Sequence, residues 1–184
     1  MADNANSTKV ITGKVRFSYA NVFTPRAAEE GGQEKFSVSV LIDKDDKETL
    51  GKIEKAIKAA LEEGKEKKFG GKIPKAYKNP LRDGEEYDDE AYEGMMFVNA
   101  NNTRKPQIVD ANTDPILDQD EFYSGCYGRA SLNFYAFNSN GNKGVACSLG
   151  NLQKLEDGEP LSASFSSAED DFGGENAYDV DDLI

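Results

Sequence analysis

The sequence predicts a mainly β domain that contains one main helix and a long C-terminal β-hairpin, followed by a disordered acidic tail. Three patterns predict it: apolar and polar residues alternate along several segments, apolar residues recur at helical spacing along one, and two alternating runs flank Asn140-Gly141. A chain of 184 residues leaves little room for a second domain of ordinary size. We therefore expect one domain over residues 1–160 and a tail over residues 161–184.

Two segments near the start of the chain alternate between apolar and polar residues, as a strand with one buried face does. The first is expected at residues 10–19, and its core side consists of Ile11, Gly13, Val15, Phe17 and Tyr19. The second is expected at residues 35–42, and its core side consists of Phe36, Val38, Val40 and Ile42. The polar sides of both carry Lys, Arg, Ser and Thr but no acidic residue, which favours a positively charged sheet face.

One helix is expected over roughly residues 46–63. Asp45 followed by Glu48 resembles a capping box, and apolar residues then recur at helical spacing until Gly64. Lysines interrupted by glycines predict a basic loop over residues 65–78. Residues 83–93 are expected to form a solvated acidic loop, and a short strand is expected over residues 95–100.

The predicted hairpin over residues 127–149 is the clearest local pattern. If Asn140 and Gly141 are its turn residues, Ser139 faces Asn142 and each further pair lies one residue farther along both strands. This register places apolar residues opposite each other on one face. The other face carries large side chains opposite small ones, and it consists of Tyr127, Arg129, Ser131, Asn133, Tyr135 and Phe137. Exposed rings in a row with an arginine suit the stacking of unpaired nucleic-acid bases.

The net charge of −12 describes the tail better than the domain. Ten acidic residues and no basic one lie in residues 156–184, so the rest of the chain carries 22 basic side chains against 24 acidic ones. A terminal block of one charge is typical of a disordered interaction tail. The domain is therefore compatible with a nucleic-acid partner.

Several kinds of chemistry are excluded by what the chain lacks. It contains no histidine and two cysteines, which excludes histidine-based catalysis and a four-ligand zinc site. It has no glycine-rich nucleotide-binding motif and no apolar run long enough for a membrane helix. We expect no cofactor and no catalysis, and we expect Cys126 and Cys147 to be buried free thiols too far apart for a disulfide.

The acidic residues suggest three other interpretations. A calcium-loop spacing is present in Asp110, Asn112, Asp114, Asp118 and Glu121. However, Pro115 stands where such a loop requires glycine. The carboxylates of residues 83–90 lie in one loop without the supporting lysine or histidine of a nuclease. The main alternative is an acidic DNA mimic that inhibits a host nucleic-acid enzyme, but a mimic needs carboxylates spread over a folded face.

Four segments in and after the hairpin form a more specific pattern: SGCYGRAS at residues 124–131, NGNKG at 140–144, NLQKL at 151–155 and DGEPL at 157–161. Together with residues 35–64 and 80–84, they resemble a family of bacteriophage-encoded single-stranded DNA-binding proteins. The resemblance implies an OB-fold-like small antiparallel barrel that holds an extended strand in a basic, aromatic groove without strong sequence preference. It also implies that the protein coats and protects single-stranded DNA in phage replication and recombination.

The candidate DNA-binding residues combine the hairpin face with the basic sides of the first strands. Bases are expected to stack on Tyr127, Tyr135 and Phe137. Phosphates are expected to contact Lys14, Arg16, Lys35 and Arg129. Further phosphate contacts are expected from Arg104 and Lys105 on a loop and from Lys143 beside the hairpin turn.

The tail is similar to the acidic tails with an apolar tip that dock replication and recombination proteins in bacteria and phages. Its expected partner-binding residues are Asp179, Asp181, Asp182, Leu183 and Ile184. A solubilising tail without a specific partner is the alternative. Because residues 1–9 do not resemble a signal peptide, we expect the protein in the cytoplasm of the infected bacterial host. The sequence leaves open whether the protein forms a homo-oligomer and whether it prefers DNA or RNA.

Overall fold

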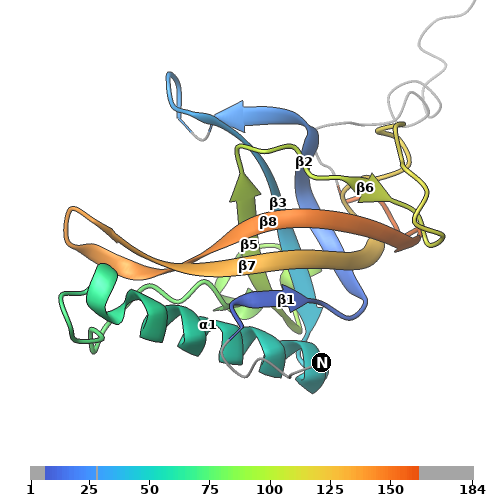
Figure 1. The fold of residues 1–184 in the computed structure, drawn as a ribbon. Helices are drawn as coiled ribbons and strands as arrows, with labels where there is room; N and C mark the ends of the chain where they lie inside the picture. The colour runs from blue at the N-terminus through green and yellow to red at the C-terminus, as the bar shows by residue number, and fades with distance from the viewer. Residues whose placement is uncertain (1–6, 28, 162–184) are drawn as a thin grey trace, which may run out of the picture.

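Five strands pair in a closed ring that forms the body of the molecule (Figure 1). The computed structural model describes residues 7–27 and 29–161, so the predicted partner-binding residues of the tail lie outside the described residues. In pairing order the strands are β2 (Val15–Ala27), β3 (Glu34–Asp43), β5 (Met95–Asn102), β8 (Asn142–Glu156) and β7 (Tyr127–Ser139). β7 closes the ring by pairing with β2, and all pairs are antiparallel except that of β5 with β8. The mainly β prediction is confirmed.

Shorter elements extend and cover this ring. The added strands are β1 (Lys9–Ile11) beside β7, β4 (Arg82–Asp83) beside β5 and β6 (Ile108–Val109) beside β8. The one long helix, α1 (Lys47–Lys67), lies below the β7–β8 hairpin in Figure 1. Two 3-10 helices, η1 (Gly84–Glu86) and η2 (Glu90–Tyr92), precede β5.

The main core lies between the ring and α1. The ring contributes Phe17, Val40 and Phe134, and α1 contributes Ile53 and Ile57, all of them buried. Burying each of these side chains contributes about 1.5–3 kcal/mol to folding. The apolar stripe of α1 therefore fixes the helix against the inner face of the hairpin, and the outer face stays available.

Helix α1 begins one residue later and ends later than predicted. Asp46 rather than Asp45 is the N-cap, and its carboxylate accepts a hydrogen bond from the Thr49 N–H at 3.1 Å. The helix continues past Gly64 because this glycine makes a close contact with β7 instead of ending the helix. A Cβ added at Gly64 would lie 2.3 Å from the Cβ of Ala136.

The same substitution is expected to have opposite effects at two glycines of α1. Gly51→Ala should raise the free energy of unfolding by about 0.5–1 kcal/mol, because alanine favours a helix and an added Cβ there meets no neighbouring element within 4 Å. Gly64→Ala should lower it by about 1–3 kcal/mol, because Ala136 occupies the space. Denaturant unfolding of both variants measures the difference. Stabilisation by both substitutions would contradict the close packing of α1 on β7.

The predicted first strand is divided into β1 and β2, and its sides differ from the prediction. The Thr12 hydroxyl, buried at the break, accepts a hydrogen bond from the Ala130 N–H at 3.0 Å. Thr12 and Ser18 are therefore buried and do not belong to an exposed polar face. Ile11 and Tyr19 are exposed instead of lying in the core. A β-bulge follows Ser18, where Tyr19 adopts a φ of 47°, and it turns the Tyr19 ring outward.

The predicted hairpin and its turn are confirmed. Asn140 and Gly141 form the turn, with φ angles of 52° and 88°. From there the pairs follow the predicted register as far as Leu132 opposite Leu149. Along β7 the residues are alternately buried and at least partly exposed up to Phe137, as the two-faced pattern predicts.

The register changes beyond this point, so the predicted pairing is wrong at the base of the hairpin. A bulge lies between Ala130 and Leu132 and leaves Ala130 opposite Leu152. The Ser131 hydroxyl accepts a hydrogen bond from the Asn151 N–H at 2.7 Å and so holds the bulge. Bulges arise from such side-chain contacts, which the alternation of residues does not reveal.

Both cysteines are buried free thiols, as predicted. Burial raises the pKa of the Cys126 thiol and that of the Cys147 thiol above the ordinary value. Because the thiolate is the reactive form, we expect neither cysteine to react with the disulfide reagent DTNB at about pH 8 unless denaturant is added. Absorbance with and without guanidinium measures the reaction. Rapid modification of the folded protein would show that the core is more open than described.

The prediction of a solvated acidic loop at residues 83–93 is confirmed in part: most of its carboxylates are exposed, but the segment forms two 3-10 helices and buries Tyr92. η2 places the side chain of Tyr92, which is 1% exposed, against Leu41 of β3 and Phe97 of β5. The Tyr92 and Phe97 rings meet edge to face with 5.0 Å between their centroids. This second, smaller core covers the outer side of β3, which is why Leu41 and Ser39 are buried.

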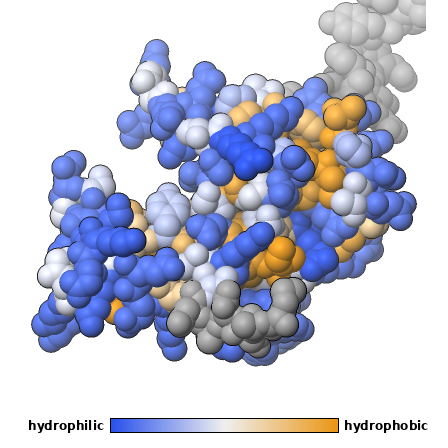
Figure 2. Space-filling view, viewed as in Figure 1, coloured by the Kyte–Doolittle hydropathy of each residue, from blue (hydrophilic) through white to orange (hydrophobic). Residues whose placement is uncertain are grey.

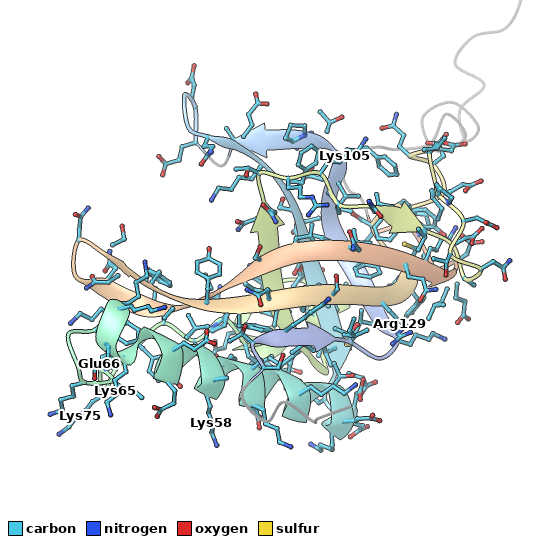
Figure 3. The ribbon with its side chains drawn as sticks, viewed as in Figure 1. Lys58, Lys65, Glu66, Lys75, Lys105 and Arg129 are labelled. Carbon is cyan, nitrogen blue, oxygen red and sulfur yellow. The ribbon has the colours of Figure 1, made fainter. Side chains whose placement is uncertain are left out.

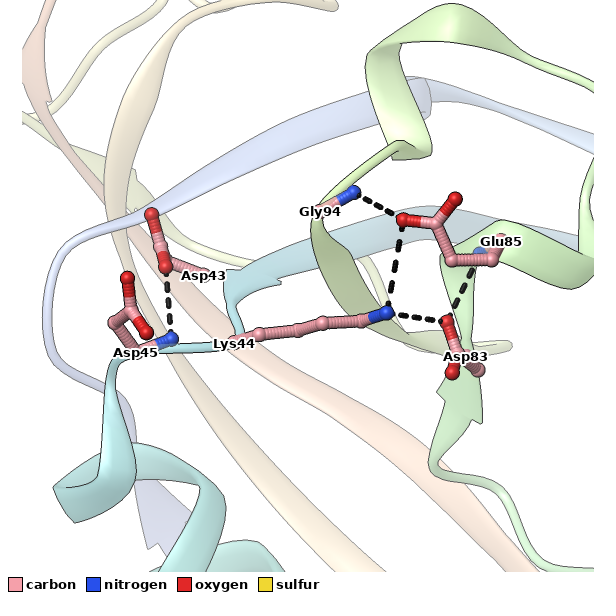
Figure 4. A network of polar contacts seen from close by, with 6 residues as sticks. All are labelled: Asp43, Lys44, Asp45, Asp83, Glu85 and Gly94. Atoms are coloured by element: carbon pink, nitrogen blue, oxygen red, sulfur yellow. Dashed lines mark hydrogen bonds and ion pairs between the residues drawn. The ribbon is translucent and has the colours of Figure 1, made fainter.

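Charged contacts hold this segment to the junction of β3 and α1 (Figure 4). The Lys44 ammonium lies 2.8 Å from a carboxylate oxygen of Asp83 and 3.6 Å from one of Glu85. Glu85 also accepts a hydrogen bond from the Gly94 N–H at 2.7 Å. The hydrogen bond from Lys44 holds the pKa of Asp83 below its usual range. The carboxylates of Asp83 and Glu85 thus hold this segment against the junction of β3 and α1.

Candidate nucleic-acid interface

A polar groove lies on the outer side of the ring, between the β2–β3 end and the β7–β8 hairpin. Its volume is about 330 Å³, and it is lined by Gln33, Lys35, Asn101, Asn102, Thr103, Asn133, Tyr135 and Ser148. The space-filling view is hollowed between these two parts of the molecule (Figure 2). The lining comes from β3, β5, β7, β8 and adjoining loops, so closure of the ring brings it together.

The groove is neutral to positive, although the whole chain is acidic. Among the described residues that line it, Lys35 alone is charged, and the rest carry amides, hydroxyls or the Tyr135 ring. Asn102 is fixed in place, because its amide nitrogen donates to the Leu149 carbonyl at 3.0 Å and its amide oxygen accepts from the Arg104 N–H at 3.1 Å. Amides and hydroxyls of this kind can hydrogen-bond to bases or sugars without electrostatic repulsion of phosphate.

Tyr135 gives the groove an accessible aromatic ring. Its side chain is 42% exposed, and the residue opposite it on β8 is the small Ala146. Within the described residues, no second aromatic ring or cation packs against it, in contrast to Tyr127. The ring face is therefore free to stack on a base.

Phe137, next on the same face, is more enclosed than the small residue opposite it predicts. It faces Gly144, and a Cβ added at Gly144 would lie 2.7 Å from the Lys78 carbonyl oxygen. Lys78 runs beside β8, because its N–H donates to the Lys143 carbonyl and its own carbonyl accepts from the Val145 N–H, both at 3.0 Å. The space opposite Phe137 is thus partly filled, and Lys143 is fixed beside the hairpin turn.

Three other predicted residues form a separate cluster at the base of the hairpin. The Lys14 ammonium and the Arg16 guanidinium lie 5.4 and 5.3 Å from the centroid of the Tyr127 ring. Arg16 also donates to the Gly125 carbonyl at 3.1 Å, and Lys14 forms an ion pair with Glu156. Both cations thus already have partners within the protein, and both lie against the Tyr127 ring.

The remaining predicted cations are Arg129 of β7 and the loop residues Arg104 and Lys105. The exposed Arg129 donates through Nε to the Thr12 carbonyl at 3.1 Å, which leaves its terminal nitrogens available. Arg104 and Lys105 directly follow the groove residue Thr103, and both are exposed. The Lys105 ammonium lies 5.9 Å from the centroid of the Phe23 ring of β2 (Figure 3).

A second groove, which the sequence did not predict, lies along the bulged part of β2. Its volume is about 1020 Å³, and its lining includes Tyr19, Phe23, Tyr123, Asp89 and Asp120. The Tyr19 hydroxyl meets that of Tyr87 at 3.4 Å, and this hydrogen bond raises the pKa of Tyr19 far above its usual value. This groove is larger and more aromatic, but among its described lining residues two carboxylates, Asp89 and Asp120, outnumber the one cation, Arg26, which disfavours phosphate.

The sequence matches one known family along almost its whole length. The model of the family described as Enterobacter phage Enc34, ssDNA-binding protein, matches residues 8–184. The chain belongs to this family. The resemblance seen over residues 35–161 is thereby confirmed, and the family match also includes β1, β2 and the acidic segment.

Relatives and solved structures agree with membership in the Enc34 family. Protein p50 of Acyrthosiphon pisum secondary endosymbiont phage 1 is 31% identical and aligns over 96% of this chain and 98% of its own. The single-stranded DNA-binding protein from bacteriophage Enc34, solved in complex with ssDNA, is 24% identical with a TM-score of 0.70, over 84% of this chain and 90% of that one. gp2.5, a single-stranded DNA-binding protein encoded by bacteriophage T7, is 16% identical with a TM-score of 0.59, over 92% of this chain and 97% of that one. These structures share the fold of this Enc34-family chain.

The described part of this family member shows neither a metal site nor a membrane-spanning helix. Within residues 7–27 and 29–161, no three Cys, Asp or Glu side chains group closely enough to hold a metal ion. In particular, the Asp110 carboxylate accepts hydrogen bonds from the N–H groups of Asn112 and Asp114, as in an ordinary polar turn. In the same part of the chain, no helix combines the length and apolar character needed to cross a bilayer.

Proposed function

We propose that this protein binds single-stranded DNA in the groove that contains Tyr135 and Lys35, with weak sequence preference. The observation that carries the proposal is an exposed ring beside a lysine in a groove whose described lining residues include no carboxylate, in a chain whose net charge is −12. Membership in the Enc34 family supports it. So does the shared fold, because the similar structures carry the name of single-stranded DNA-binding proteins.

Each lining group has a part in this proposal. A base stacks on Tyr135, which typically contributes about 1–3 kcal/mol whatever the base. Lys35 neutralises a phosphate, and the amides of Asn101 and Asn133 donate or accept, so that they tolerate different base edges. Arg104 and Lys105, which follow Thr103, bind the phosphates of the DNA where it leaves the groove. Sequence preference stays weak because stacking and charge, rather than a fixed donor pattern, supply the affinity.

The other predicted contacts extend the site toward the base and the tip of the hairpin. Arg129 offers its free guanidinium nitrogens to a phosphate, and Lys14 and Arg16 supply positive potential beside Tyr127. Phe137 and Lys143 continue the track toward the turn. In this proposal the protein coats and protects single-stranded phage DNA during replication and recombination in the cytoplasm of the infected host.

Titration of a fluorescent oligo-dT by anisotropy tests the proposal. We expect saturable binding that weakens as salt rises from about 50 to 200 mM, because counterions are released from the phosphates. Unlabelled single strands of mixed sequence should compete about as well as oligo-dT, and a duplex should compete poorly. Absence of binding even at about 20–50 mM salt, where screening is weak, would favour the DNA-mimic alternative.

We further propose that the acidic segment recruits phage or host replication and recombination proteins and competes with DNA for the basic residues. Residues 169–184 contain seven carboxylates and no basic side chain. Their removal is expected to tighten oligo-dT binding, most at low salt, because a tethered polyanion acts at high effective concentration. The same truncation should abolish partner capture. Unchanged DNA affinity together with intact partner capture would leave only a solubilising role.

A further inference from the structure

The last turn of α1 and the chain segment after it form a basic lobe beside the tip of the β7–β8 hairpin. We define this basic lobe as residues 65–78 together with Lys143. Residues 65–78 contain six lysines and a single carboxylate, that of Glu66. Figure 3 shows Lys65 and Lys75 projecting away from the ribbon at this end of the molecule. Positive charge is thus concentrated here, in a protein whose net charge is −12.

The lysines of the basic lobe have no carboxylate partner within the described part of the chain, as is also true of Lys35, Lys47 and Lys55. Among the described residues, none of the lobe lysines lies within 4.0 Å of a carboxylate oxygen, whereas Lys44, Lys52 and Lys154 each do. Lysines in the last turn favour the negative end of a helix, but Lys72, Lys75 and Lys78 lie beyond the end of α1. Their charges are therefore not needed to stabilise the fold.

The basic lobe is built onto the hairpin. Phe69 is buried in the main core, and the Asn138 side chain donates to the Lys68 carbonyl at 3.0 Å. On the other side, Lys78 makes the two backbone hydrogen bonds with β8 described above. The lobe lysines from Lys68 to Lys78 therefore keep a fixed place relative to Tyr135, although they lie beyond the end of α1.

The distance between the groove and the basic lobe suits one continuous strand of nucleic acid. Asn138, which contacts the lobe, is three residues from Tyr135 along β7, or roughly 10 Å at about 3.3 Å per residue. The lobe offers ammonium groups but hardly any accessible ring, because Phe69 is buried and Tyr77 is half-buried. Lysines without rings suit phosphates rather than bases.

We propose that the basic lobe binds the phosphates of a single strand longer than the groove, which continues from Tyr135 around the hairpin tip. This inference rests on the proposed function and adds a second contact region to it. The groove supplies stacking, and the lobe supplies charge. The affinity contributed by the lobe should therefore appear only with longer strands and should depend strongly on salt.

The test compares two double variants of the full chain that remove the same charge. Lys72→Gln/Lys75→Gln changes exposed lysines of the lobe, and Lys47→Gln/Lys55→Gln changes exposed lysines near the other end of α1. Anisotropy measures their affinity for oligo-dT of about 6 and about 30 nucleotides, a range that brackets the usual site sizes. Lys72→Arg/Lys75→Arg, which keeps the charge, serves as a rescue.

For the lobe variant we expect binding of the long oligonucleotide to weaken on the order of 3- to 10-fold. The slope of log affinity against log salt concentration should fall by about 1.4, or about 0.7 for each lost phosphate contact. Binding of the short one, and both affinities of the control and of the arginine variant, should match the wild type. Equal affinities of the lobe variant and the control for the long strand would overturn the proposal, as would an equal loss for both lengths. Failure of the wild type to bind either strand would instead refute the proposed function.

Discussion

Replacing Tyr135 by alanine is expected to weaken oligo-dT binding by about 5- to 150-fold, which corresponds to the about 1–3 kcal/mol that stacking on one ring contributes. The ring is 42% exposed and lies opposite Ala146, so its removal leaves little cavity in the core. The melting temperature should therefore stay close to that of the wild type. Fluorescence anisotropy at fixed salt, with a thermal melt of the same sample, measures both quantities.

Tyr87→Ala is the matched control for this substitution. Tyr87 is 39% exposed, but it packs on Tyr92 at 4.7 Å between ring centroids, away from the Tyr135 groove. Its removal should lower stability slightly and leave DNA affinity unchanged. If Tyr135→Ala bound oligo-dT as tightly as the wild type, the outer face of the hairpin would not belong to the binding site.

Replacing the neighbouring Phe134 by alanine is expected to have the opposite consequences. Phe134 is 1% exposed and points into the main core, so truncation should lower the free energy of unfolding by about 3–5 kcal/mol. At about 2–4 °C per kcal/mol for a chain of this size, the melting temperature should fall by about 6–20 °C. Well below that temperature, the affinity of the folded variant for oligo-dT should match the wild type.

The two adjacent positions thus separate stability from binding. Successive residues of a strand point to opposite faces, so Phe134 reports on the core and Tyr135 on the groove. Scanning calorimetry measures the melting temperature of each variant, and anisotropy measures its affinity for oligo-dT. A large loss of DNA affinity in Phe134→Ala, measured where the variant is fully folded, would mean that the hairpin faces are assigned wrongly.

The hairpin could be predicted from the sequence because its determinants are local. Asn140-Gly141 specifies the turn, and the alternation around it specifies which residues share a face. The capping residues and spacing of α1 are equally local, and the helix was predicted to within a few residues. Family resemblance in residues 124–161 then extended the local pattern to a fold, which the family match and the shared structures support.

The groove could be predicted only in part, because it depends on pairing between distant segments. Lys35 and Tyr135 were expected to bind DNA, and ring closure brings both to one groove. Asn101 and Asn102 were not identified, because polar residues at the end of a strand give no periodic signal. Only the pairing of β5 with β3 and β8 places them beside the hairpin.

In two places, residue type was a poor guide to environment. Residues 83–93 are rich in carboxylates, yet Tyr92 anchors them in a second small core that covers β3. Arg16 was expected to contact phosphate, and its guanidinium also donates to the carbonyl of Glu159, 143 positions away in the sequence. Contacts over such separations follow from the closed ring and not from any local pattern.

Photo-crosslinking can show whether DNA lies on the outer face of the hairpin. An oligo-dT that carries 5-iododeoxyuridine would be irradiated in complex with the full-length protein, and the modified peptide identified by mass spectrometry. Stacking brings the base into contact with the ring. If bases stack on the outer face of the hairpin, the crosslinks should lie at Tyr135 in β7. Crosslinks confined to Tyr19, Phe23 or Tyr123, which line the other groove, would contradict it.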